Sequence, residues 1–188
     1  MQAIEAILTR VTVPPVKMGE PGPDAAALSR MLEAAAAAPD HGRLQPWRFL
    51  VVRGEGRAAL GELFARALTA ERPETSRGEL DKQRTSPLRA PLIIVAIARP
   101  DPDHPKIPAW EQQASAACAV HNLLLAAHAM GFAGKWATGG NAMSPLVCAG
   151  LGLAAGEYIT GFLYIGSATE VPPVPPRPAP ETIAKAWP

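Results

Sequence analysis

The chain has 188 residues, a length that suits one domain with a substantial buried core. Hydrophobic residues make up 48% and charged residues 19%, and the net charge of +1 excludes the strongly basic surface typical of nucleic-acid-binding proteins. The longest apolar runs are much shorter than a membrane span and no signal-peptide pattern follows Met1, so we expect a cytoplasmic protein without nucleic-acid or membrane partners.

The first part of the chain predicts two helices separated by a proline-rich loop. A short helix is expected over Ile4–Leu8, followed by a loop over Val11–Pro23. Asp24 suits the N-cap position of an alanine-rich helix, Ala25–Ala38. Pro39 lacks a backbone N–H and therefore ends that helix.

The middle of the chain predicts strands that alternate with helices. After a polar loop over Asp40–Pro46, we expect a strand at Trp47–Val52 and a helix at Arg57–Ala70. The polar segment Glu71–Arg89 predicts a mixture of helix and exposed loop. The run Leu92–Ala98 is apolar on both faces, which indicates a central strand covered on both sides.

The last part of the chain contains the longest predicted helix. This helix is expected over Ala109–Met130, with Gly131 as the residue that follows its end. Two further strands are expected at Phe132–Trp136 and Tyr158–Ile165, with a short helix between them that Ser144-Pro145 opens.

A proline-rich tail follows from about residue 171. Six prolines in the nine positions Pro172–Pro180 predict an extended segment that runs over a surface of this chain or of a partner. The alternation of helices with a few short strands predicts one α+β domain over residues 1–188.

Cys118, His121 and His128 share the long helix, and we interpret them as helix packing and not as a metal site, because no further ligand pair is visible.

The loop after the second helix carries the most information about function. In the run Ala38-Pro39-Asp40-His41-Gly42-Arg43-Leu44-Gln45-Pro46-Trp47, a histidine and a glutamine stand between a helix end and a strand. The chain here resembles the nitroreductase superfamily, and most closely its small YdjA-like subgroup. Further motifs match that family in the same order, over roughly residues 2–168. They are Arg10-Val11-Thr12, Arg89-Ala90-Pro91-Leu92-Ile93-Ile94, Pro108-Ala109-Trp110-Glu111-Gln112, Gly131-Phe132-Ala133-Gly134-Lys135-Trp136 and Gly161-Phe162-Leu163-Tyr164-Ile165-Gly166.

The resemblance implies a fold, a cofactor and an assembly. The fold is an antiparallel-rich central sheet wrapped by helices, in an intertwined homodimer with two FMN sites at the interface. The activity is NAD(P)H-dependent reduction of nitroaromatics, quinones or similar small-molecule acceptors, by ping-pong hydride transfer through flavin N5. The flavin supplies the redox chemistry, so no side-chain nucleophile is expected.

The resemblance also places individual residues at the flavin. Arg10 and Thr12 would bind the phosphate, because a guanidinium and a hydroxyl suit that anion. His41 would reach the cofactor from the second subunit, and Gln45 would pair with the polar edge of the ring system. The alternatives are a solvated cation for Arg10, a loop histidine that binds backbone carbonyls for His41, and a loop brace for Gln45.

A second set of residues is expected beside the flavin ring. The turn Trp136-Ala137-Thr138-Gly139 would lie against it, with backbone N–H groups that donate to N5 or O4, while Trp136 also suits core filling. Val11, Ala37 and Ala137 are expected among the cofactor-binding residues as well, although the resemblance implies arginines at these three positions. This loss of three guanidinium groups leaves a second hypothesis, in which the chain is a degenerate dimer with weak or lost FMN binding that serves as a binding module.

Overall fold

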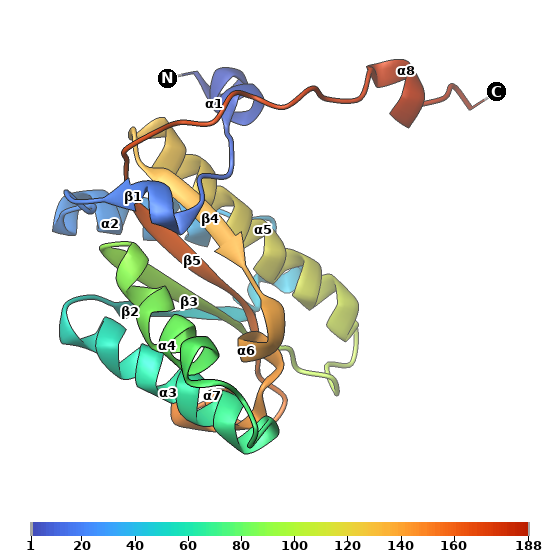
Figure 1. Cartoon of the computed structure of the whole chain (residues 1–188). Coiled ribbons are helices and arrows are strands. Elements are labelled where there is room, and N and C mark those ends of the chain that lie inside the picture. Colours follow the sequence, from blue (N-terminus) through green and yellow to red (C-terminus); the bar gives the residue numbers. More distant parts are fainter. Residues whose placement is uncertain (1, 188) are drawn as a thin grey trace.

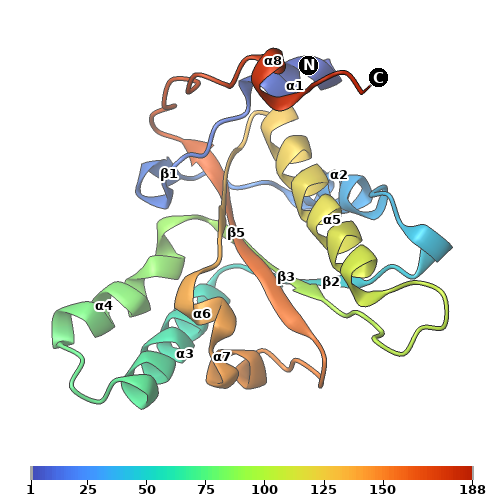
Figure 2. The same ribbon diagram turned by 90° about the vertical axis from the view of Figure 1, so that its right-hand side faces the viewer.

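A five-stranded sheet lies at the centre of the protein, between two layers of helices (Figures 1 and 2). The computed structural model describes residues 2–187. The strand order is β1-β5-β3-β2, β4 also pairs with β5, and all these pairings are antiparallel. The strands are β1 (Met18–Gly19), β2 (Trp47–Val52), β3 (Leu92–Ala98), β4 (Ala133–Ala137) and β5 (Tyr158–Ala168). The expected antiparallel-rich sheet is therefore confirmed.

Strand β3 is buried along its whole length, as its two-sided apolar pattern predicts. Its odd-numbered residues pack against α3 (Glu55–Glu71) and α7 (Pro145–Gly150), and its even-numbered residues pack against α2 (Ala25–Ala36) and α5 (Ala109–Ala129). Successive side chains of a strand point to opposite faces, so this one segment joins the two halves of the core.

Two predicted helix-end residues, Asp24 and Gly131, lie where the sequence places them. The carboxylate of Asp24 accepts a hydrogen bond of 2.7 Å from the backbone N–H of Ala27 at the start of α2. Helix α2 stops at Ala36, two residues earlier than expected, because the residue before a proline avoids the helical region. Gly131, with φ of 87°, follows α5 as predicted.

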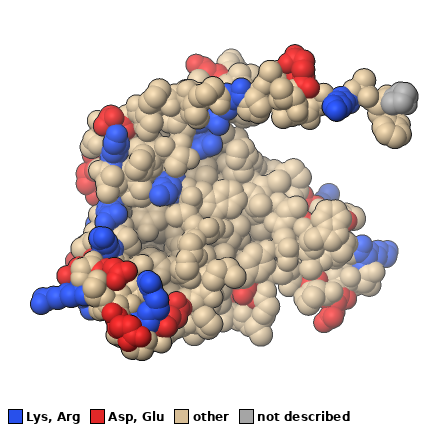
Figure 3. Space-filling model, turned by 45° about the vertical axis from the view of Figure 1, so that its right-hand side comes forward, with Lys and Arg blue, Asp and Glu red and all other residues tan. Residues whose placement is uncertain are grey.

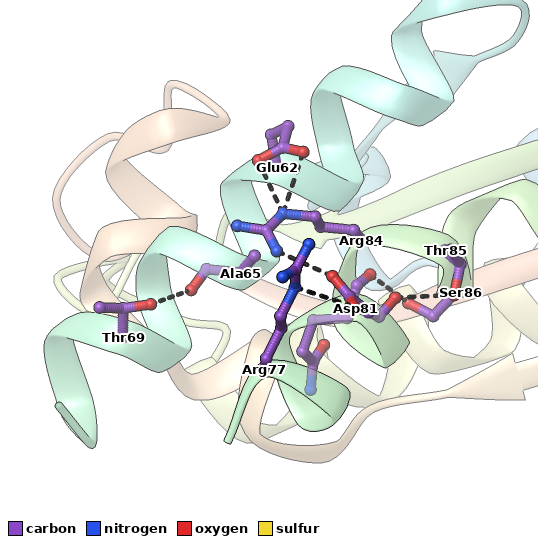
Figure 4. Close-up of polar contacts among 9 residues, drawn as sticks. Glu62, Ala65, Thr69, Arg77, Asp81, Arg84, Thr85 and Ser86 are labelled. Atoms are coloured by element: carbon purple, nitrogen blue, oxygen red, sulfur yellow. Dashed lines mark hydrogen bonds and ion pairs between the residues drawn. The ribbon is translucent and has the colours of Figure 1, made fainter. Parts of the chain in front are cut away.

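The polar segment after α3 folds back on it as helix α4 (Arg77–Thr85), followed by the 3-10 helix η3 (Ser86–Arg89). Figure 4 shows how Arg84 joins the two helices. Its Nε lies 3.2 Å from the Glu62 carboxylate on α3, and its Nη1 lies 3.0 Å from Asp81 on α4. These exposed ion pairs orient the hairpin more than they stabilise it.

Several boundaries differ from those expected. The predicted loop Val11–Pro23 contains β1 and a 3-10 helix, because pairing with the far end of β5 gives a two-residue strand that has no periodic signal of its own. Strand β4 starts and ends one residue later than predicted, β5 runs three residues further, and α3 begins two residues earlier. Besides β1, the elements not predicted at all are η1 (Pro15–Lys17), η2 (His41–Arg43), α6 (Gly139–Met143) and α8 (Pro180–Ile183). Helix α1 covers Ala3–Thr9.

The C-terminal tail leaves β5 as an extended arm. Residues 171–179 have no helix or strand, and the arm passes α1 and projects beyond the rest of the chain (Figure 1). Basic side chains gather where the arm leaves the body, above a hollowed face of mostly uncharged residues (Figure 3). Within residues 2–187, no helix is both long and apolar enough to cross a lipid bilayer.

Candidate functional site

Two motifs that are distant in the sequence meet at the outer edge of β4. Thr12 forms an isolated parallel bridge with Gly134, and the Val13 backbone N–H donates to the Gly134 carbonyl over 3.3 Å. Val11 is buried in the core, whereas Arg10 is half-buried and Thr12 is exposed. The Arg10-Val11-Thr12 segment therefore presents a cation and a hydroxyl beside β4.

Trp136 and Ala137 belong to β4 itself, so the predicted turn begins only at Thr138. The Trp136 Nε1–H donates to the Thr160 carbonyl over 2.9 Å, and the indole rests against Gly161 of β5. Trp136 is 36% exposed and belongs to neither buried cluster, so core filling does not describe it. Beyond Gly134, no strand in residues 2–187 pairs with the outer edge of β4, which leaves its backbone groups open to a ligand.

A small cavity lies between the Arg10 segment, the end of α5 and the start of β4. Arg10 and His128 are its basic side chains, and the His128 Nε2 lies 2.9 Å from the Thr9 hydroxyl. Burial, and then the nearby Arg10 charge, lower the pKa of His128 below its usual value. The guanidinium of Arg10 is therefore the group in this cavity that suits an anion.

Arg177 of the C-terminal arm is a further cation at this place. Its Nη2 donates to the Arg10 backbone carbonyl over 3.1 Å. Sequence reasoning missed it, because a single arginine among prolines gives no sign of where its chain segment returns. Lys17, by contrast, is held in an ion pair with Glu170 at 2.8 Å. Arg177 therefore places a second guanidinium beside Arg10.

The other predicted residues lie together at a different place. Ala37 caps the end of α2, and His41 and Gln45 are exposed on the loop that follows. The alternative in which His41 binds backbone carbonyls is wrong, because its Nδ1 contacts the Glu111 carboxylate at 2.8 Å. Gln45 does brace the loop, but through its backbone N–H, which donates to the Asp40 carboxylate over 2.7 Å.

This loop is held in an unusual backbone conformation. Arg43 and Gln45 have φ values of 56° and 48°, in the left-handed region that non-glycine residues rarely adopt. Gly42 between His41 and Arg43 has φ of 75° and lies against Ile107, where a side chain would collide. Residues in such conformations cost of order 1–3 kcal/mol each and cluster at functional sites.

Helix α5 separates the two groups of residues. His41 contacts Glu111 in its first turn, whereas Arg10 lines a cavity with His128 in its last turn. At a rise of about 1.5 Å per residue, these turns stand roughly 25 Å apart. One chain therefore does not bring Arg10, Trp136 and His41 to a single ligand. Within residues 2–187, no group of three or more His, Cys, Asp or Glu side chains is placed to hold a metal ion.

Comparison with known proteins identifies the family of this chain. The model of the "Nitroreductase family" matches residues 18–167. The Escherichia coli (strain K12) protein named "Putative NAD(P)H nitroreductase YdjA" is 38% identical over 167 residues, which are 89% of this chain and 88% of that protein. A Haemophilus influenzae protein named "Putative NAD(P)H nitroreductase" is 35% identical over 172 residues, 90% of each chain.

Solved structures agree on the fold. A "Nitroreductase-like Family Protein" from Bacillus cereus superposes with a TM-score of 0.85 at 25% identity, covering 100% of this chain and 96% of that one. A "Nitroreductase with Bound FMN" from Bacteroides fragilis superposes with a TM-score of 0.72 at 23% identity, covering 100% and 99%. With the family model matching most of the chain and two relatives above 30% identity, the chain belongs to the nitroreductase family.

Proposed function

We propose that this protein is an FMN-dependent NAD(P)H oxidoreductase that reduces nitroaromatic, quinone or similar acceptors. Family membership and the names of its relatives support an oxidoreductase that uses NAD(P)H. One observation carries the proposal of FMN: the Arg10-Val11-Thr12 segment is bridged to β4 exactly where that strand's outer edge becomes open. A phosphate-binding group and an open row of backbone donors then lie side by side.

The chemistry of these donors fits a flavin mononucleotide. Arg10 and Arg177 are the cations for the phosphate, and the Thr12 hydroxyl adds a donor. Backbone groups of Trp136, Ala137 and Thr138 would face the ring, and Trp136 holds this segment on β5 through its bond to Thr160. When bound, FMN supplies the redox chemistry, taking electrons from NAD(P)H and giving them to the acceptor in two half-reactions.

Flavin titration tests this function directly. The purified protein is expected to bind FMN, and anaerobic NADH or NADPH should bleach the flavin absorbance. Arg10→Ala should raise the FMN Kd by roughly 10–100-fold, because hydrogen bonds to charged groups contribute about 1.5–3 kcal/mol. Arg30→Ala is the matched control and should leave the Kd unchanged, since within residues 2–187 the Arg30 guanidinium pairs only with the exposed Glu33 on α2, at 3.1 Å.

A homodimer would complete the site. Two copies whose α5 helices run antiparallel would bring His41, Gln45 and Ala37 of one subunit to Arg10 and Trp136 of the other. Exposed apolar side chains support such an interface, because Ile4 and Leu8 on α1 and Trp187 on the arm are 68%, 60% and 94% exposed. The Pro-rich arm, which projects beyond its own chain, would then lie over the partner.

Hybrid dimers test the shared site. Arg10→Ala and His41→Ala homodimers should each bind FMN weakly at both sites. A hybrid of the two variants has one doubly altered site and one intact site, so each hybrid dimer that forms on mixing the subunits should regain one tight FMN site by fluorescence titration. Mixing two batches of Arg10→Ala should restore none. A monomer by light scattering, or a hybrid without a tight site, would contradict the shared site.

A second candidate function is a degenerate dimer that acts as a binding module. It is favoured by Val11, Ala37 and Ala137, which stand at three positions where the resemblance implies arginine. A colourless protein that FMN titration cannot tint would establish it, whereas a tight yellow complex would exclude it. The cytoplasmic location expected from the sequence stays a prediction.

A further inference from the structure

Glu111 makes a contact that the proposed flavin site does not explain by itself. It lies in the first turn of α5, with its side chain 30% exposed, and its Oε2 is 2.8 Å from Nδ1 of His41. The two residues are 70 positions apart in the sequence, so the contact is tertiary. His41 remains 65% exposed, and the hydrogen bonds of residues 2–187 include none to its other ring nitrogen, Nε2.

The carboxylate determines which nitrogen of His41 carries the proton. An ionised carboxylate only accepts hydrogen bonds, so the Nδ1 that it contacts must be protonated. In a neutral imidazole, Nε2 is then left bare as an acceptor. Nε2 is therefore the ring nitrogen that the Glu111 contact leaves available, on a side chain that is 65% exposed.

Other contacts hold the loop so that this orientation is kept. Arg99 donates from Nε to the Gln45 carbonyl over 3.2 Å. The neighbour of Glu111, Gln112, is buried and binds both the N–H and the carbonyl of Asp101 over 2.8 Å, and the Ile107 carbonyl over 3.0 Å. Ile107 in turn packs against Gly42, next to His41. The start of α5 therefore fixes both the backbone and the ring of His41.

We propose that Glu111 is a positioning residue that holds His41 as its Nδ1–H tautomer, so that Nε2 accepts a hydrogen bond from an N–H or O–H donor of the flavin bound in the other subunit. This inference rests on the proposed function. It accounts for the strained loop, because the left-handed Arg43 and Gln45 are tolerated where they present a side chain at a fixed angle.

The tautomer is measured first, without any flavin. Nitrogen NMR of ring-labelled histidine at pH 8 should show His41 protonated at Nδ1 in the wild-type protein. In Glu111→Ala that preference should be lost, and the two tautomers should mix. Lys106→Ala is the control, since its side chain is exposed and makes no hydrogen bond within residues 2–187, and it should leave the His41 signals unchanged.

The effect on ligand binding is measured second, as a double-mutant cycle on the FMN Kd. Glu111→Ala should raise the Kd roughly two- to tenfold, the size of one neutral hydrogen bond. In a His41→Ala background the same change should have no further effect, because Glu111 acts only through His41.

The outcomes separate the two proposals. A wild-type protein that binds no FMN overturns the proposed function and this inference together. A wild-type protein that binds FMN, with Glu111→Ala leaving the tautomer or the Kd unchanged, overturns the inference alone. Equal losses of affinity from Glu111→Ala with and without His41 would also overturn it, since they indicate a general structural role.

Discussion

Replacement of Gly161 by alanine is expected to weaken FMN binding on the order of tenfold and to destabilise the protein by about 1–3 kcal/mol. A Cβ at this position would collide with the indole of Trp136 and lie 3.1 Å from the Ala137 carbonyl oxygen. The indole would have to rotate and give up its 2.9 Å bond to Thr160. Because β4 carries the open edge proposed for the flavin, displacement of the indole causes both the weaker FMN binding and the loss of stability.

Thermal unfolding and FMN titration check this prediction together. Gly78→Ala is the matched control, because a Cβ there meets nothing within 4 Å, and alanine suits the interior of α4 better than glycine. Removing the indole as well, in Gly161→Ala with Trp136→Ala, should recover part of the stability lost in the single variant. If Gly161→Ala binds FMN as tightly as the wild type, the placement of the flavin on this edge is wrong.

Removal of Arg48 is expected to destabilise the protein by about 2–3 kcal/mol, or roughly 4–12 °C in Tm. Arg48 on β2 clasps Glu157, just before β5, with Nε–Oε1 and Nη2–Oε2 distances of 2.8 and 2.6 Å. It also donates to the Gly152 carbonyl over 3.1 Å. Arg48→Ala leaves the Glu157 carboxylate, whose side chain is only 11% exposed, without its cation.

Low pH should reduce the difference in stability between the wild type and Arg48→Ala. The bonds from Arg48 lower the pKa of Glu157 from its usual 4.5 to about 2. A carboxyl whose folded pKa is lowered contributes stability above its unfolded pKa, and that contribution is lost as the pH falls through the folded value. The stability gap between wild type and Arg48→Ala should therefore be full at neutral pH and shrink between pH 4.5 and 2, as measured by urea denaturation. Lys17→Ala, which breaks the more exposed pair with Glu170, should change stability by less than about 1 kcal/mol.

Much of the fold can be predicted from residues that lie close together in the sequence. The two-sided apolar run of β3, the length of α5 and the cap at Asp24 each depend on residues a few positions apart, so periodicity and side-chain chemistry predict them. The site residues of the Arg10-Val11-Thr12 and His41 motifs could be predicted for the same reason, because each motif is a short contiguous segment. Their roles at a flavin stay predictions until the titrations above are done.

The sequence by itself determined most of the longer strands and helices and which short motifs carry polar side chains. Only the tertiary structure decided that β1 pairs with the end of β5, that Arg177 returns to Arg10, that Glu111 meets His41, and that α5 separates the two groups of site residues. Contacts of this kind join residues that are 70 to 167 positions apart. They depend on sheet register and helix packing summed over the whole chain, which no local pattern records.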